Sequence, residues 1–303
     1  MIFQDKNPGD GRRQWLRYAI SVPYLWVLLF FVAPFFIILK ISFADPIVAQ
    51  PPFTALFDWA KTGFEQLQIT YDNYLFLIQD RFYSIIYLSS LKMAAVSTLL
   101  CLLLGYPMAY FIARQPDRRR NILLLGIILP FWISFLLRVY AWMGLLGTHG
   151  VFNNILMALG IIDSPVQMLY NDFAVYVGIV YSYLPFMILP LYANLARMNL
   201  DLHDAASDLG AKPWQVFLDV TLPQSKPGII GGCMLVFIPA SGEFVIPALL
   251  GGSDTLMIGA VLWDEFFKNR DWPVASAVSV ILLLILVPPM MWFQKSQAQQ
   301  ELE

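Results

Sequence analysis

Residues 86–112 read IYLSSLKMAAVSTLLCLLLGYPMAYFI, an apolar run whose single charged side chain is Lys92. The hydrocarbon core of a bilayer is about 30 Å thick, and a helix needs about 20 apolar residues to cross it. Strands of a membrane barrel would instead alternate apolar and polar residues in segments of about ten. The continuous run therefore predicts a membrane-spanning helix.

The composition of the whole chain agrees with this prediction. Of its 303 residues, 58% are hydrophobic and 13% are charged, whereas an average soluble domain has about 45–50% and about 25%. The formal net charge is −2, so no basic excess points to nucleic acid as a partner. We expect an all-α polytopic membrane protein in contact with lipid.

Five further runs are long enough to cross a bilayer. The six predicted spans are residues 19–39, 86–112, 122–146, 173–195, 228–250 and 274–293. The first follows three arginines as a signal peptide would, but it is too long and has no clear cleavage site, so we interpret it as a retained anchor. Residues 19–293 are thus predicted to form one membrane domain.

The distribution of Lys and Arg orients these spans. With both termini in the cytoplasm, twelve Lys and Arg side chains lie inside and four lie outside: Lys61, Arg81, Lys268 and Arg270. This excess follows the positive-inside rule. The cytoplasmic parts are then residues 1–18, 113–121, 196–226 and 294–303, and the outer loops are 42–85, 147–172 and 251–273.

The predicted outer loops carry eleven Asp and Glu residues. A negative outer surface would attract cations. The same excess also arises if topology merely removes Lys and Arg from outer loops. Both explanations remain open.

The most informative loop reads DLHDAASDLGAKPWQVFLDVTLP over residues 201–223. Asn199 or Asp201 is suited to cap a short helix, and Gly210 stands where a left-handed residue would end it. Pro213 fits the first turn of a second helix. Because Ala205 and Ala206 leave one side of the first helix nearly bare, this loop is predicted to dock another protein.

Six residues of this loop carry a family resemblance: Asp204, Ala205, Ala206, Gly210, Leu222 and Pro223. Their spacing resembles the signature Glu-Ala-Ala-x3-Gly-x9-Ile-x-Leu-Pro of permease subunits of bacterial ATP-binding-cassette importers. Asp204 replaces Glu and Val220 replaces Ile, and the shorter acid could weaken a contact. The resemblance implies a type I importer permease fold, in which this loop is the coupling helix that binds the ATPase subunit.

Three other segments resemble the polyamine branch of this family, the importers of putrescine or spermidine. They are LPFWISFLLRVYAW at 129–142, GEFVIP at 242–247 and NRDWP at 269–273. The resemblance implies a bacterial inner-membrane subunit that transports by alternating access. It also implies three kinds of partner: a homologous second permease, two ATPase subunits that bind ATP and Mg²⁺, and an extracytoplasmic substrate-binding protein.

Glu243 is the one acid inside a predicted span. A carboxylate at the bilayer centre costs at least about 2.5 kcal/mol unless it meets water, a partner or a proton. Our hypothesis is that Glu243 lines the translocation pathway and receives an amine; a buried pair with Arg138 or Lys92 is the alternative. Tyr181 and Trp142 could offer aromatic faces to an ammonium group.

Arg138 is expected to extend toward the outer interface, as long basic side chains near helix ends do.

Several catalytic patterns are absent from the sequence. It contains no G-x-x-x-x-G-K-[ST] loop, no H-E-x-x-H helix and no G-x-S-x-G turn. His149 and His203 fall in opposite predicted compartments, so no metal-ligand cluster can be assembled. We therefore expect neither enzymatic activity nor a cofactor or metal in this chain.

Two alternatives differ in substrate or class. A permease of the same family could carry iron, sulfate, molybdate, thiamine or another organic cation. A secondary transporter coupled to ions is disfavoured, because the spans hold a single acid and no inverted repeat.

Overall fold

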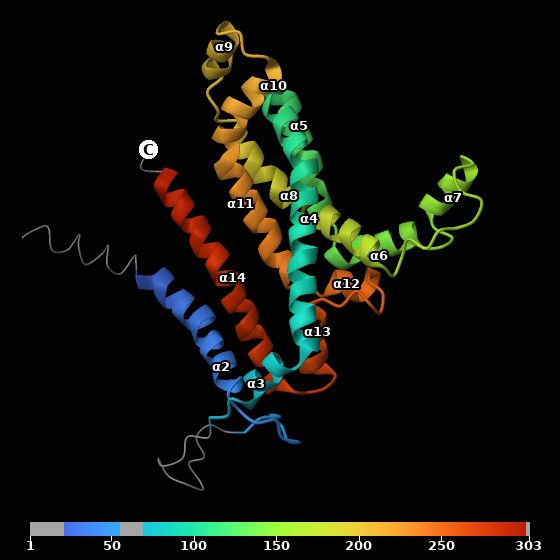
Figure 1. Ribbon diagram of the computed structural model, residues 1–303, viewed down its shortest axis with the longest axis vertical. Helices are drawn as coiled ribbons and strands as arrows, with labels where there is room; N and C mark the ends of the chain where they lie inside the picture. The colour runs from blue at the N-terminus through green and yellow to red at the C-terminus, as the bar shows by residue number, and fades with distance from the viewer. Residues whose placement is uncertain (1–20, 55–68, 301–303) are drawn as a thin grey trace, which may run out of the picture. The chain divides into compact units, whose positions relative to one another are not determined.

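The computed structural model describes residues 21–54 and 69–300, and Figure 1 shows a chain built from helices. Within this described part, β-structure is limited to an isolated antiparallel bridge between Pro46 and Phe53. The predicted all-α fold class is confirmed. The predicted cytoplasmic segment 1–18 and residues 55–68 of the first outer loop lie outside the described residues.

The chain divides into two compact units. The first consists of Met1–Leu77 with Glu265–Ile281, and the second of Ile78–Asp264 with Leu282–Glu303. Helices near the junctions therefore contribute residues to both units, and each unit is considered by itself below.

The described helices of the first half of the chain are η1 (Leu28–Val32), α2 (Ala33–Ile41), α3 (Asp72–Gln79), α4 (Arg81–Ala113), α5 (Asp117–Ile128), η3 (Leu129–Trp132) and α6 (Phe135–Leu146). Those of the second half are α7 (Val151–Ala158), α8 (Asp172–Leu195), α9 (Asp201–Asp208), α10 (Pro213–Val216), η4 (Phe217–Thr221), α11 (Leu222–Ser241), α12 (Val245–Leu250), α13 (Ile258–Phe267) and α14 (Trp272–Gln300). The segments η1 and η4 are π-helical, and η3 is a 3₁₀ turn.

Four described helical stretches are long and apolar enough to cross a membrane. They are Ser21–Ile41, Arg81–Ala113, Asp172–Leu195 and Trp272–Met291. They match the predicted first, second, fourth and sixth spans. A fifth candidate is the pair Asp117–Trp132 and Phe135–Ala158, which is bent by 93°.

The predicted third and fifth spans are not continuous helices, and on this point the sequence prediction is wrong. In the third, Pro130 lies in the 3₁₀ turn that follows α5, and Ile133 is extended before α6 begins. In the fifth, α11 ends at Ser241, and three residues separate it from α12. Proline removes a backbone donor and glycine weakens the helix ladder, so each break falls where the sequence provides such residues. The count of six spans stays a prediction.

Helices α4, α8 and α11 pack against one another and form the core of the second unit (Figure 1). Gly232 of α11 allows close packing: a Cβ atom there would lie 2.7 Å from Met187 Sδ and 3.1 Å from the Met187 carbonyl oxygen. Gly228 and Gly232 thus make a close helix contact, with α8 as the partner. Buried Leu191 and Val236 fill the space around it.

In the first unit, polar side chains join the end of α2 to α3. The Asn73 amide donates to the carbonyl oxygens of Ser42 at 3.0 Å and of Ala44 at 2.8 Å. The hydroxyls of Ser42 and Tyr74 lie 2.7 Å apart. Part of the predicted first outer loop is therefore helical.

The segment 269–273 forms the turn between α13 and α14 in the first unit. Arg270 has φ of 54°, and Asp271 Oδ1 accepts from the Val274 amide at 3.0 Å. Burial raises the pKa of the Asp271 carboxyl, the hydrogen bond from Val274 opposes this, and Glu265 adds to the rise. The segment 269–273, which resembles the polyamine branch, therefore stabilises the start of α14.

Candidate functional site

The predicted docking loop begins with an exposed helix, α9. Asn199 Oδ1 accepts from the Asp201 amide at 2.9 Å, so Asn199 is the residue that holds the helix start. Asp204 and Ala205 are exposed, and Ala206 is half-buried. Figure 1 shows α9 projecting beyond one end of α8 and α11, where a second protein could reach it.

Gly210 ends α9 as the sequence predicts. Its φ is 83°, a left-handed conformation that costs other residues about 1–2 kcal/mol. The Ala211 amide donates to the Ala206 carbonyl oxygen at 3.1 Å, and the Gly210 amide donates to that of Ser207 at 2.9 Å. These two bonds form a Schellman motif, which closes the exposed end of the helix.

Leu222 and Pro223 lie at the other end of the loop. The chain is helical without interruption from Pro213 through α10 and η4 into α11, so these two residues form the first turn of α11. The predicted second helix at Pro213 is confirmed. The six signature residues are therefore divided between an exposed helix and the base of a core helix.

An exposed apolar surface accompanies this loop, and the sequence reasoning missed it. Leu209 is 90% exposed, Trp214 is 59% exposed, and Leu202 and Leu218 are also exposed. Exposed apolar groups of this kind mark protein contacts. The available signal was the position of Leu209 directly before the helix-ending Gly210.

The Glu243 carboxylate lies in the break between α11 and α12 and is 8% exposed. Its Oε1 accepts from the amides of Phe244 at 3.1 Å, Val245 at 3.0 Å and Ile246 at 3.5 Å. Its Oε2 accepts from the Tyr183 hydroxyl at 2.6 Å. Glu243 thus holds the start of α12 and ties it to α8.

No ion pair joins Glu243 to Arg138 or Lys92 within the described ranges. The described hydrogen-bond donors to Glu243 are therefore all neutral groups, three amides and one phenol.

The structure brings Trp142 and Tyr181 together but places them apart from the Glu243 bonds. Their rings lie 5.3 Å apart, edge to face. Both line an apolar cavity of about 410 Å³ between α4, α6 and α8. Tyr181 and Tyr183 differ by about 200° around α8, which explains why Tyr183, and not Tyr181, meets Glu243.

Arg138 is buried, at 8% exposure, so the expectation that it extends to the interface is wrong. Its guanidinium carbon lies 5.2 Å from the Phe131 ring centre and 5.6 Å from that of Phe135. Phe131 contacts Phe186, which contacts Tyr183. Aromatic packing leads from Arg138 to the phenol that binds Glu243, and the rings stabilise the cation in place of water.

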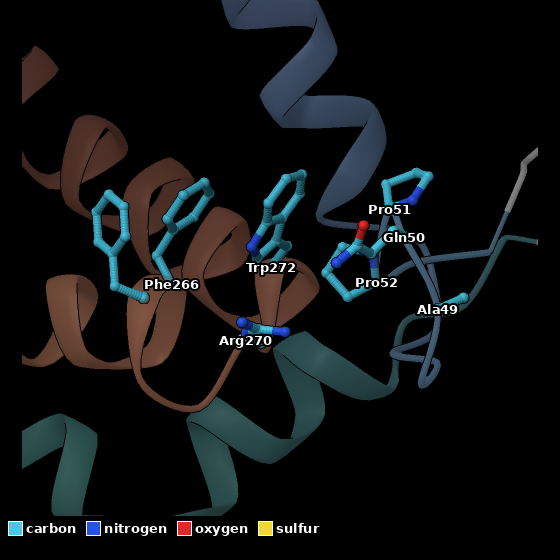
Figure 2. Close-up of a pocket in the computed structure, with 8 residues that line it drawn as sticks. Ala49, Gln50, Pro51, Pro52, Phe266, Arg270 and Trp272 are labelled. Carbon is cyan, nitrogen blue, oxygen red and sulfur yellow. The ribbon is translucent and has the colours of Figure 1, made fainter.

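A cavity of about 490 Å³ occurs in the first unit, and Figure 2 shows Trp272 and Phe266 with Pro51 and Pro52 around it. Phe266 and Trp272 stack at 4.8 Å. Glu243, Tyr181 and Trp142 do not line this cavity. Within the described ranges, no group of three His, Cys, Asp or Glu side chains could hold a metal ion.

Residues 102–297 match the family described as binding-protein-dependent transport system inner membrane component. The chain belongs to this family. Members of the binding-protein-dependent transport family are inner-membrane subunits, so the protein is a multi-pass component of a bacterial inner-membrane transporter and not itself an enzyme.

Curated relatives of this transport component come from several bacteria. The spermidine/putrescine transport system permease protein PotB of Escherichia coli K12 is 38% identical over 261 residues, covering 86% of this chain and 90% of the relative. The protein of the same name from Haemophilus influenzae is 36% identical over 268 residues, covering 88% and 89%. Among solved structures, a bacterial ABC transporter that imports the polysaccharide alginate is similar, with a TM-score of 0.63, 20% identity and coverage of 95% and 98%.

Proposed function

We propose that this chain forms half of the pathway of an ATP-driven importer for a polyamine, putrescine or spermidine. The observation that carries the proposal is the similarity to spermidine/putrescine permeases, at 36–38% identity over 86–88% of the chain. The identity extends over nearly the whole membrane domain, well beyond the short docking loop that permeases share.

The chemistry around Glu243 supports a cationic substrate. The Glu243 carboxyl accepts hydrogen bonds from four neutral donors, and a carboxylate without a partner cation is the group that an ammonium would pair with. Trp142 and Tyr181 could receive an amine on their ring faces. We assign these three residues to the substrate pathway.

The exposed helix α9 supports coupling to a separate ATPase. Its Asp204, Ala205 and Ala206 stand next to the exposed Leu209 and Trp214, so a cleft on an ATPase could cover an apolar patch around a helix with small side chains. The proposed assembly contains this chain, a homologous second permease, two ATPase subunits that bind ATP and Mg²⁺, and a soluble binding protein that delivers substrate. Alternating access would then follow movement of the loop 201–223 with the ATPase.

The direct test is uptake by the reconstituted complex. Proteoliposomes with the permeases, the ATPase and the binding protein should accumulate radiolabelled putrescine or spermidine only when ATP is present inside the compartment that faces the ATPase. Excess unlabelled polyamine should compete, whereas sulfate, molybdate, iron and thiamine should not. Uptake that requires a proton or sodium gradient and no ATP would contradict the proposal.

A further inference from the structure

His203 joins the docking helix to two core helices through both of its ring nitrogens. Its Nδ1 lies 3.2 Å from Arg114 Nη2, and its Nε2 lies 3.1 Å from Thr221 Oγ1. Arg114 is the C-cap residue of α4, and Thr221 is the N-cap residue of α11. One imidazole therefore connects α9 with one end of α4 and one end of α11.

The protonation of this imidazole follows from its partners. A guanidinium can only donate hydrogen bonds, so Nδ1 must be the unprotonated acceptor and Nε2 must carry the hydrogen that is donated to Thr221. The Thr221 hydroxyl can in turn donate to the Val216 carbonyl oxygen at 3.5 Å. Hydrogen bonds are thus donated in turn from Arg114 to His203, from His203 to Thr221 and from Thr221 to Val216, and this order requires a neutral His203.

The surroundings make these bonds specific. Thr221 is 1% exposed. The Tyr110 ring holds Arg114 in place, because the guanidinium carbon lies 5.0 Å from the ring centre. Helices α4 and α11 pack on each other, so their two ends form one rigid attachment point. Side chains with a single polar atom could bind one of these ends, whereas the imidazole binds both.

We propose that His203 is the positioning residue that transmits movement of the docking helix α9 to α4 and α11, and that only its neutral form does so. The inference rests on the proposed function, because it assumes that α9 moves with an ATPase. A proton on Nδ1 would face the Arg114 guanidinium, break that bond and separate α9 from α4.

The charges near His203 favour the neutral form. Burial lowers the pKa of His203 below its usual 6.5, Arg114 of α4 lowers it further, and Asp204 of α9 itself opposes them. Thr221, the neighbour at the base of α11, carries no charge. The neutral link therefore persists to lower pH than it would with an ordinary histidine, and it is lost as pH falls through the lowered pKa of His203.

The experiment compares His203→Gln, His203→Phe and Thr221→Val in the complete complex, with His149→Gln as the matched control at the other histidine. Polyamine uptake and ATP hydrolysis are measured between pH 5 and pH 8 on the side of the ATPase. In the wild type, uptake should fall at the acid end. Thr221→Val should reduce uptake about tenfold at pH 7.5, the loss expected for one hydrogen bond that involves a buried group. His203→Phe removes the bonds to both Arg114 and Thr221 and should reduce uptake at least as much, while the ATPase still copurifies.

The titration separates transmission from simple packing. His203→Gln keeps an amide that can bond but does not titrate, so it should retain more uptake than His203→Phe and should lack the acid fall attributable to this residue. His149→Gln should keep the wild-type profile. Wild-type uptake in His203→Phe, or an unchanged acid fall in His203→Gln, would overturn the inference.

Hydrogen exchange gives a readout that does not need the substrate. Amides of residues 201–209 in the purified complex should lose protection in the wild type as pH falls through the lowered pKa of His203, after correction for intrinsic exchange, and not in His203→Gln. If the wild type shows no ATP-dependent polyamine uptake, the proposed function fails, and exchange still decides the link: protection that is insensitive to pH would overturn it.

Discussion

Replacement of Glu243 by Gln separates the two roles that this carboxylate can have. The change keeps a side-chain oxygen that can accept from the Phe244 and Val245 amides, now at 3.1 and 3.0 Å, but it removes the negative charge. If the charge binds an ammonium group, the lost interaction is a charge-assisted hydrogen bond of about 1.5–3 kcal/mol. This corresponds to a decrease of about 10-fold to 100-fold in the rate of uptake, measured at a subsaturating concentration of substrate.

Two companion variants set the scale for the structural role. Glu243→Ala removes the acceptor of three amides and leaves the Tyr183 hydroxyl without its partner. A lost cap costs about 1 kcal/mol and a stranded buried donor about 1–3 kcal/mol, so this variant should unfold more easily by about 2–4 kcal/mol. Tyr183→Phe keeps the charge and removes one bond, so it should lose stability but retain most of the uptake.

The assay is initial uptake of labelled polyamine in proteoliposomes, with copurification of the ATPase and thermal unfolding of the complex as controls. The pathway role predicts that Glu243→Gln assembles normally, unfolds near the wild-type temperature and transports at least tenfold less. If Glu243→Gln transports as well as the wild type while Glu243→Ala does not, the carboxylate only holds α12, and the reasoning is refuted.

Three further predictions concern Gly210, Gly259 and Asp271. Gly210→Asp strains a residue with φ of 83° by about 1–2 kcal/mol and should reduce copurification of the ATPase; Gly160→Asp, at φ of 68°, is the matched control and should leave it intact. Gly259→Ala would place Cβ 2.3 Å from the Gly242 carbonyl oxygen and should destabilise the protein by about 1–3 kcal/mol in thermal unfolding; a wild-type melting temperature would contradict this. The Asp271 carboxyl has a raised pKa, so its protonated form stabilises the folded turn, and this stabilisation is lost as pH rises above the usual 3.8. Asp271→Asn should keep the helix cap and remove this pH dependence. Hydrogen exchange of the α14 amides measures both effects.

The docking loop shows which features can be predicted from local sequence. Gly210 and Pro213 were placed correctly because each has a backbone preference that its own residue type dictates: a left-handed φ for one and a helix start for the other. The position of Leu209 directly before Gly210 was a weaker signal, because residue type and position alone do not determine whether an apolar side chain is covered. Its exposure depends on how α9 stands on the rest of the chain.

The spans show the same division. Continuous apolar runs predicted the helices around residues 86–112 and 173–195, because the membrane imposes a length that composition alone reveals. Mean composition could not reveal the bend of 93° after Trp132 or the gap after Ser241, since each run stays long and predominantly apolar across its break. Proline and glycine marked the positions, but membrane helices tolerate them when neighbouring groups satisfy the freed carbonyls.

By itself, the sequence determined that the protein lies in a membrane, its fold class and its family. These follow from the length of the apolar runs, the placement of Lys and Arg, and the spacing of the signature residues in the loop 201–223. Only the tertiary structure decided which side chains meet. Tyr183 rather than Tyr181 binds Glu243, and His203 binds both Arg114 and Thr221, across 89 and 18 residues of sequence. Such contacts depend on the rotation and end positions of packed helices, which no local pattern encodes.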